Sequence, residues 1–320
     1  MLDNLLINTV DGLSLGAIYA LVALGYTMVY GVLRLINFAH SEIFLIGTCA
    51  SLVVVNAVAP SAPLSGVALL GIVLLMAAVA MVASGAGAMA LEFVAYRPLR
   101  KHGASRLAAL ISAIGASLFL QQFFALFVIP WLFDKPKEGG RLPVQPEQHF
   151  VDRHDVFSIG GVGVANDKLI VFIAAILMMV VLDQFVNRTK LGRGIRSTAQ
   201  DPETAVLMGV NIDRIVTATF AIGGAMAGVA AALYVLRFEE TFFMVGFLLG
   251  IKAFTAAVLG GIGNIRGALT GGFVLGLLEM YGSMVFGSAW KDVVAFVILI
   301  LVLMFRPTGI LGESLQQARA

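Results

Sequence analysis

The sequence has 320 residues and a formal net charge of +2, with 59% hydrophobic and 12% charged residues. Its mean hydropathy is +0.95, and the charged fraction is about half the roughly 25% of soluble domains. So few charges cannot cover a soluble surface of this size. Composition therefore excludes an ordinary cytosolic enzyme, a disordered chain and a disulfide-stabilised secreted module, and makes the lipid bilayer the expected solvent.

Residues that bind metals or form disulfides are few. Cys49 is the only cysteine, and the four histidines are scattered along the sequence, so no internal disulfide and no metal site is expected. No long basic run indicates nucleic-acid binding. The first residues lack the basic region of a cleavable signal peptide, so the first apolar stretch is expected to remain as a membrane helix.

Nine apolar segments are candidate membrane spans, because a span needs about 20 mostly apolar residues. They are 10–33, 42–59, 66–94, 107–130, 168–187, 214–236, 246–263, 267–287 and 291–306. The seventh is short, rich in glycine and contains Lys252, so a full span and a broken or re-entrant helix both remain open. The predicted fold is all-α: a single domain over 1–320, built as a polytopic bundle of about eight or nine spans.

The distribution of Lys and Arg predicts the orientation. If all nine segments span, thirteen of the 21 basic residues fall on one side: Arg34, Arg97, Arg100, Lys101, Arg106, Arg188, Lys190, Arg193, Arg196, Arg214, Arg266, Arg306 and Arg319. The opposite side holds Lys135, Lys137, Arg141, Arg153, Lys168, Arg237 and Lys291. The richer side is predicted to be cytoplasmic, with the N-terminus outside and the C-terminus inside.

One long polar stretch, 131–167, falls on the outer side. It contains prolines, two glycine pairs and mixed charges, which indicates an external loop with a short hairpin and no separate domain. A solvated connector and a docking surface for an external protein are the two interpretations.

Polar residues also interrupt the apolar sequence between the first two spans, in the segment Ile36–Glu42. If it lies in water, it is an ordinary short loop. If it lies at membrane depth, Asn37, His40 and Glu42 are candidates for a transport pathway or a hinge, because polar groups are tolerated there only in protein or beside water.

The segment 188–214 carries start and stop signals for a short helix on the cytoplasmic side. Asp201 is a suitable N-cap, Pro202 suits the first helical position, and Glu203 favours the first turn. We therefore predict an amphipathic helix from Pro202 to Met208, ended by Gly209. An ordinary basic loop would not need these signals.

Glycines recur at four-residue spacing around the last two connections, at Gly263, Gly267 and Gly271, and again at Gly272 and Gly276. Small residues at this spacing allow helices to approach closely in lipid. The pattern of a nucleotide-binding loop is not present, so close helix packing is the expected role.

Two charged residues stand inside apolar segments, Lys252 in the seventh and Glu279 in the eighth. With Ile265 as the turn, each lies about 20 Å from it at about 1.5 Å per residue. An unpaired charge in hydrocarbon is costly, so we predict an intramembrane ion pair. A Lys252 side chain that extends to the headgroups is the alternative.

Five separated motifs, in order along essentially the whole chain, carry a family resemblance. They are Gly31–Glu42, Val94–Arg100, Arg193–Asp213, Lys252–Gly272 and Arg306–Gly312. Together they resemble the inner-membrane permeases of branched-chain amino-acid ABC importers, and most of all the H-type subunit of the leucine/isoleucine/valine system. The family usually has glycine where this chain has Ser41, and proline where it has Arg266.

The resemblance implies a set of partners in a bacterial inner membrane. These are a second, homologous permease subunit, two cytoplasmic ATPase subunits, a periplasmic substrate-binding protein, a small amino-acid substrate and the surrounding lipid. No cofactor and no catalytic residue is implied in this chain. The segment Glu203–Gly209 fits the family's coupling-loop pattern, with Thr204 at its second position.

The predicted site residues form three groups. Those expected to couple to the ATPase are Gly192, Arg193, Arg196, Asp201, Pro202, Glu203, Ala205 and Gly209. Those expected in the pathway or at a hinge are Asn37, His40, Glu42, Thr255 and Asn264, and the predicted intramembrane pair is Lys252 with Glu279. The predicted function is import of leucine, isoleucine or valine. The alternatives are another small solute, such as urea, an amide or an aromatic amino acid, and a membrane-embedded enzyme with His40 and Glu42 as acid and base.

Overall fold

The computed structural model describes residues 2–58, 60, 62–136, 140–306 and 308–312. Lys137, Pro307 and Arg319, which enter the sequence arguments, lie outside them. Within this part of the chain, eight helices are long and apolar enough to cross a membrane, and a ninth apolar helix is shorter. The predicted polytopic, all-α bundle is therefore confirmed.

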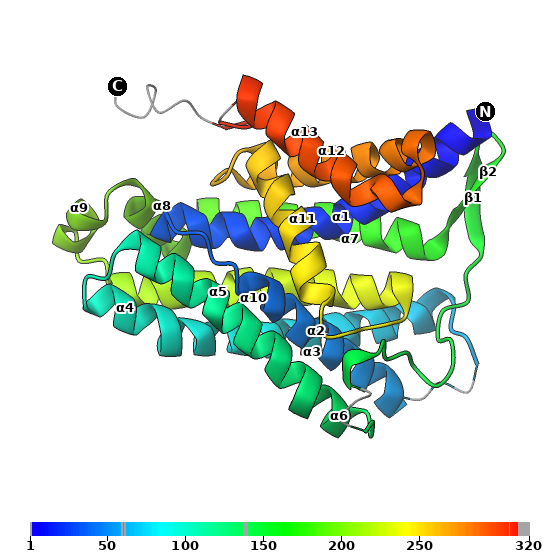
Figure 1. Cartoon of the computed structure of the whole chain (residues 1–320), viewed down its shortest axis with the longest axis horizontal. Coiled ribbons are helices and arrows are strands. Elements are labelled where there is room, and N and C mark those ends of the chain that lie inside the picture. Colours follow the sequence, from blue (N-terminus) through cyan, green and yellow to red (C-terminus); the bar gives the residue numbers. More distant parts are fainter. Residues whose placement is uncertain (1, 59, 61, 137–139, 307, 313–320) are drawn as a thin grey trace.

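The elements follow one another as a string of long helices interrupted by short ones (Figure 1). They are α1 (Leu2–Leu33), α2 (His40–Val58), α3 (Gly66–Leu91), a π-helical turn (Glu92–Tyr96), α4 (Arg97–Lys101), α5 (Arg106–Phe123), a second π-helical turn (Phe124–Val128), α6 (Ile129–Leu132), β1 (Asp155–Ile159), β2 (Val162–Ala165), α7 (Asn166–Arg188), α8 (Lys190–Gln200), α9 (Pro202–Leu207), α10 (Ile212–Phe238), α11 (Val245–Gly260), α12 (Ile265–Phe286), a 3₁₀ turn (Ser288–Trp290) and α13 (Lys291–Phe305). The antiparallel strands β1 and β2 form the hairpin predicted in 131–167.

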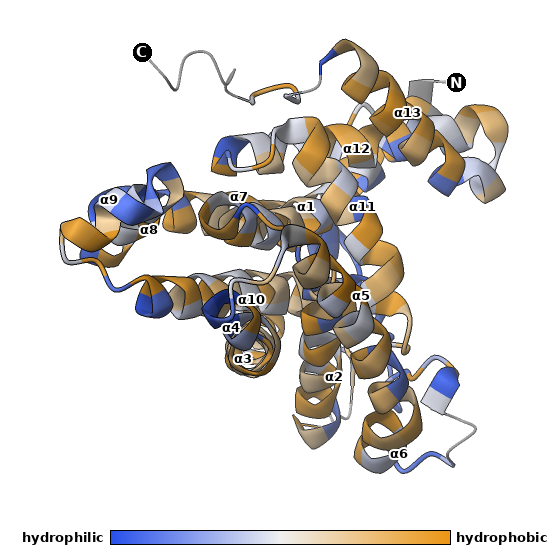
Figure 2. Ribbon diagram, turned by 60° about the vertical axis from the view of Figure 1, so that its left-hand side comes forward, coloured by the Kyte–Doolittle hydropathy of each residue, from blue (hydrophilic) through white to orange (hydrophobic). Residues whose placement is uncertain are grey.

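The bundle has two distinct ends. In Figure 1, α8 and α9 lie at the left, whereas the β1–β2 hairpin and the N-terminus lie at the right. We call these the α9 end and the hairpin end. Helices α1 and α10 are mostly buried in the centre, whereas α7 and α13 leave most of their apolar surface uncovered. Figure 2 shows apolar residues along the outer faces of the long helices and polar ones gathered at α8, α9 and α4. This is the surface expected of a protein solvated by lipid.

Two helices start inside the bundle instead of at one of its ends. His40, the first residue of α2, lies against Gly25 of α1. Gly25 precedes the last residue of α1, Leu33, by eight residues, which corresponds to about 12 Å along the helix. Gly246, the second residue of α11, lies against the backbone of Ser41. The links 34–39 and 239–244 thus enter from opposite ends, and the helices that follow them meet in the middle. Helix α11 begins inside the bundle and, with 16 residues, is shorter than the eight candidate spans.

Close helix contacts explain four of the five repeated glycines: Gly272 and Gly276 lie against α1, and Gly267 and Gly271 lie against the last turn of α11. A Cβ atom on Gly272 would lie 2.5 Å from Cα of Ala20, and one on Gly276 would lie 2.5 Å from Cα of Gly16. Since real Cβ atoms do not approach so closely, only glycine permits this backbone spacing. Gly263 differs, because it has φ of +98° in the turn before α12 and nothing lies near its Cβ position.

The glycine contact gives a stability prediction. Gly272→Val would force α1 and α12 apart, at a cost of about 1–3 kcal/mol or more for an overpacked core. We expect a lower melting temperature for the detergent-purified protein. Gly71→Val is the matched control, because Gly71 is also within a long helix but has open space at its Cβ position. Equal melting temperatures for the two variants would contradict the packing argument.

Candidate functional site

The α9 end carries a short helix whose two ends are fixed by side-chain and backbone signals. The Asp201 carboxylate accepts hydrogen bonds from the backbone N–H groups of Glu203 (3.0 Å) and Thr204 (3.2 Å). The Thr204 hydroxyl donates to the same carboxylate, and these bonds lower the pKa of Asp201 below its usual value. Gly209 ends the helix with φ of +83°. The cap predicted from the sequence is therefore present and charged at neutral pH.

Helix α9 presents apolar side chains to the surroundings. Val206, Leu207 and Met208 are 54%, 85% and 81% exposed, whereas Ala205 is buried. A polar helix end with a large exposed apolar patch is typical of an interaction site, not of a solvated loop.

The remaining predicted coupling residues lie on α8 and its start. Thr189 caps α8 by accepting a hydrogen bond from the Gly192 N–H (2.9 Å), and Gly192 packs so tightly against the end of α7 that a side chain would not fit. Arg193 is exposed, and Arg196 donates to the Asn187 side chain (2.6 Å). All eight predicted coupling residues lie on α8, α9 and the residues that flank α9, at the α9 end.

A buried polar cluster lies where α2 and α11 meet. The Tyr96 hydroxyl donates to Asn37 (2.8 Å), His40 packs edge-on against Tyr26 at 4.8 Å between ring centroids, and Glu42 accepts a hydrogen bond from Ser117 (3.1 Å). Asn37, His40 and Glu42 are each at most 2% exposed. This burial excludes the interpretation of Ile36–Glu42 as a solvent-exposed loop.

Each of these three residues has one buried polar atom without a hydrogen-bond partner in the described part of the chain. Nδ2 of Asn37, Nε2 of His40 and Oε2 of Glu42 have no hydrogen-bond partner within the described residues. Beside them is a cavity of about 230 Å³, lined by Tyr26, Phe38, Ser41, Ile114, Ser117, Leu118, Phe247 and Ile251. Unpaired buried polar groups are costly, and in native proteins they often mark functional sites.

The other two predicted pathway residues lie elsewhere. Thr255 is buried on α11, where its hydroxyl donates to the Ile251 carbonyl. Asn264 lies at the α9 end, caps α12 through the N–H groups of Arg266 and Gly267, and donates to the Leu311 carbonyl. The structure therefore does not bring Asn264 to the polar cluster.

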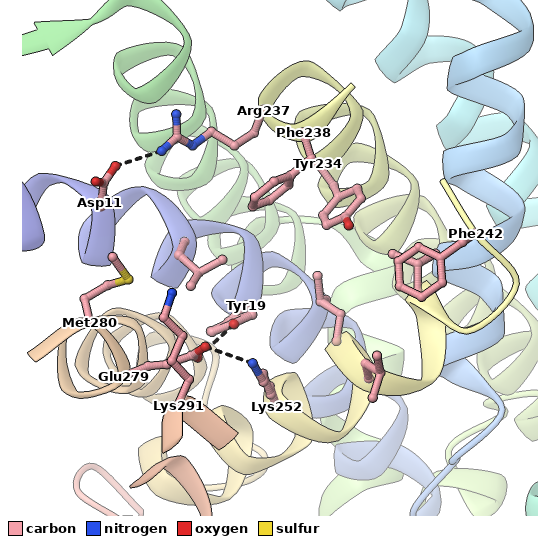
Figure 3. A pocket seen from close by; sticks show the side chains of 14 residues that line it. Asp11, Tyr19, Tyr234, Arg237, Phe238, Phe242, Lys252, Glu279, Met280 and Lys291 are labelled. Carbon is pink, nitrogen blue, oxygen red and sulfur yellow. Dashed lines mark hydrogen bonds and ion pairs between the residues drawn. The ribbon is translucent and has the colours of Figure 1, made fainter. Parts of the chain in front are cut away.

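Lys252 and Glu279 lie together on α11 and α12, with 2.8 Å between Nζ and Oε1 (Figure 3). The lysine also contacts Asp292 of α13 at 2.7 Å, and the Tyr19 hydroxyl of α1 donates to the second oxygen of Glu279 at 2.8 Å. Sequence reasoning missed Asp292 and Tyr19, because nothing in their local sequence indicates helices that meet only in the folded bundle. The group joins four helices.

These features define a polytopic helical membrane protein with a capped surface helix at one end and polar groups in its interior. The chain matches the family model "Branched-chain amino acid transport system / permease component" over residues 8–303 and belongs to that family.

Curated relatives agree with this assignment. The chain is 43% identical over 305 residues to the high-affinity branched-chain amino acid transport system permease protein BraD of Pseudomonas aeruginosa, covering 95% of this chain and 94% of that one. It is 41% identical over 310 residues to the corresponding LivH protein of Escherichia coli K12, with the same coverage. The probable LivH of Methanocaldococcus jannaschii is 26% identical over 302 residues, 91% of this chain and 88% of that one. No solved structure matches.

The ion pair predicts a non-additive mutation series. Lys252→Met and Glu279→Gln should each destabilise the protein, by about 3–5 kcal/mol if the remaining charge stays buried. The double variant should recover part of that loss. Folded protein after extraction, measured by size-exclusion chromatography and thermal unfolding, gives the readout. Asp292→Asn is the control with a smaller expected loss, because the Asp292 side chain is 61% exposed. Strictly additive losses would refute the pairing as a stabilising contact.

Proposed function

We propose that this chain is the membrane-spanning subunit of an ATP-driven importer that carries branched-chain amino acids into the cytoplasm. The observation that carries the proposal is the capped helix α9, which presents exposed apolar side chains beyond the bundle in a member of this permease family. The substrate class is taken from the names of the relatives BraD and LivH. The chain supplies a pathway and does no covalent chemistry.

In this proposal the α9 end faces the cytoplasm of a bacterial inner membrane, and the hairpin end faces outward. The excess of Lys and Arg in the short connections supports this orientation, because such residues are retained on the cytoplasmic side. Arg34, Arg97 and Arg100 lie at the α9 end, close to α8 or α10. The N-terminus is then outside and the C-terminus inside.

Four partners complete the proposed machine. Two ATPase subunits bind at α9 and at the equivalent helix of a second, homologous permease subunit. A binding protein delivers the amino acid at the hairpin end, where the loop 131–167 and the Glu239–Met244 link lie against each other through the Val144–Thr241 backbone pair. Co-purification of this chain with the four partners tests this composition. A permease that purifies active without ATPase subunits contradicts it.

A hydrogen bond connects α8, next to α9, with the link that leads to the polar cluster. The Arg34 guanidinium donates to the Ala199 carbonyl of α8 at 3.0 Å, and Arg34 begins the link that leads to Asn37 and His40. We propose that ATP binding by the partners displaces α8 and α9 and shifts this link, so that the cavity beside Glu42 opens alternately to the two sides. Irregular backbone at membrane depth is the usual location of transporter sites.

The coupling proposal predicts a specific loss of function. Glu203→Lys reverses a charge on exposed α9 and should lower uptake of labelled leucine about tenfold or more, because charge reversal at an interface costs several kcal/mol. The protein should still insert and keep its melting temperature, since Glu203 is exposed and its side chain makes no hydrogen bond or ion pair within the described residues. Glu203→Gln, which removes the charge without reversing it, should retain most uptake. Normal uptake by Glu203→Lys would disprove this role of α9.

A further inference from the structure

A second cavity, of about 390 Å³, lies on the other side of α11 from the polar cluster (Figure 3). Helices α1, α10, α11 and α12 form its walls, and Lys291 from the start of α13 reaches over it. Leu248, Leu249 and Lys252 of α11 line this cavity, whereas Phe247 and Ile251 of the same helix line the smaller one. Helix α11 therefore separates two cavities. The size of the larger one is within the roughly 300–1,000 Å³ of small-molecule sites.

Charges of both signs are fixed at its borders. At one border Lys252 is paired with Glu279. At the other, toward the hairpin end, Oδ1 of Asp11 accepts from both Arg237 and Lys168, each at 2.7 Å. These pairs keep ionised groups in place at membrane depth, where an isolated charge would be expelled or neutralised.

Some charged side chains at these borders still have hydrogen-bonding atoms available for a ligand. The Lys291 ammonium makes no hydrogen bond or ion pair within the described residues, and Figure 3 shows it pointing toward α1. Lys252 contacts two carboxylates and has a third donor to spare. Asp11 also lines the cavity, and both cations that it binds contact its Oδ1 atom. A ligand with one anionic and one cationic group would find a partner for each.

The rest of the wall is apolar. Leu15, Val245, Leu248 and Leu249 form an aliphatic surface, and the rings of Tyr234, Phe238 and Phe242 line the cavity on the side of Arg237, away from Glu279 (Figure 3). Such a surface suits a branched aliphatic side chain, and the aromatic faces also attract an ammonium group. A ligand that is only an anion would bind the lysines but make no use of the apolar surface or of the acidic side chains of Asp11 and Glu279.

We infer that this cavity is a binding site for the zwitterion of an aliphatic amino acid, occupied before the substrate crosses α11 to the polar cluster. Its carboxylate contacts Lys291 and Lys252, its ammonium contacts Asp11 and the aromatic rings, and its side chain packs against the leucines. The inference rests on the proposed function and adds to it a site outside the predicted pathway residues. A zwitterionic lipid headgroup carries the same pair of charges, so the test must separate the two ligands.

The test measures binding of labelled leucine to the purified transporter complex, in nanodiscs made of phosphatidylglycerol alone and without the binding protein. Lys291→Gln removes the carboxylate partner and should raise the Kd about tenfold, as expected for loss of a charge-assisted hydrogen bond. Leu248→Trp should fill the cavity and weaken binding at least as much. The matched controls are Lys101→Gln, exposed on α4, and Leu301→Trp, on α13 with an exposure close to that of Leu248.

Three results distinguish the outcomes. Binding that is lowered by both cavity variants, unchanged in both controls and not displaced by isocaproate or isoamylamine supports a site that requires both charges. Unchanged binding in both cavity variants, no binding by the parent complex, or displacement of leucine when phosphatidylethanolamine replaces phosphatidylglycerol overturns the inference. Failure of the parent complex to import leucine with ATP and binding protein, while binding persists, overturns the proposed function and leaves the site standing.

Discussion

In a bilayer, every polar group that leaves water must find its partner inside the protein, and this constraint shapes the whole bundle. Asp11, Arg237 and Asp167 form a continuous chain of ion pairs that ties α1, α10 and α7 together at the hairpin end. Glu92, fully buried in the π-helical turn after α3, accepts from Arg97 and Arg100 at the α9 end. Arg100 is in turn paired with Asp213 of α10, so each network joins helices far apart in the sequence. The charges that oppose insertion of the chain into lipid therefore also fix its tertiary arrangement.

The same constraint makes unpaired polar atoms inside the bundle an indication of function. Asn37, His40 and Glu42 each retain an unpaired atom at the point where α2 and α11 begin, so three of the eight unpaired buried side-chain atoms of the described residues gather there. A stable core would have no reason to keep such atoms, because satisfying them would stabilise it. Their position beside a cavity, between two links that enter from opposite ends, is what an alternating pathway needs.

Local signals in the sequence predicted the local features. Apolar length gave the spans, and Asp201, Pro202 and Gly209 gave the start and end of α9. Depth arithmetic from the turn at Ile265 placed Lys252 and Glu279 at one level, and the structure has them in contact. Features that depend on the packing of several helices could not be predicted from the sequence. The start of α2 inside the bundle, the contribution of Asp292 and the larger cavity all require the packing of α1, α10, α11 and α12, and no spacing in the sequence encodes that packing directly.

The most direct test of the central claim asks what α9 touches. Because Cys49 is buried, Leu207→Cys places a single accessible thiol on α9. Labelled with a maleimide–diazirine reagent and irradiated, the complex is predicted to give a cross-link between this chain and an ATPase subunit, with a yield that changes when ATP is added. Leu142→Cys, at an exposed position in the loop 131–167, should give no such cross-link. A Leu207→Cys thiol that reacts with a monofunctional maleimide but never cross-links to the ATPase would contradict the account.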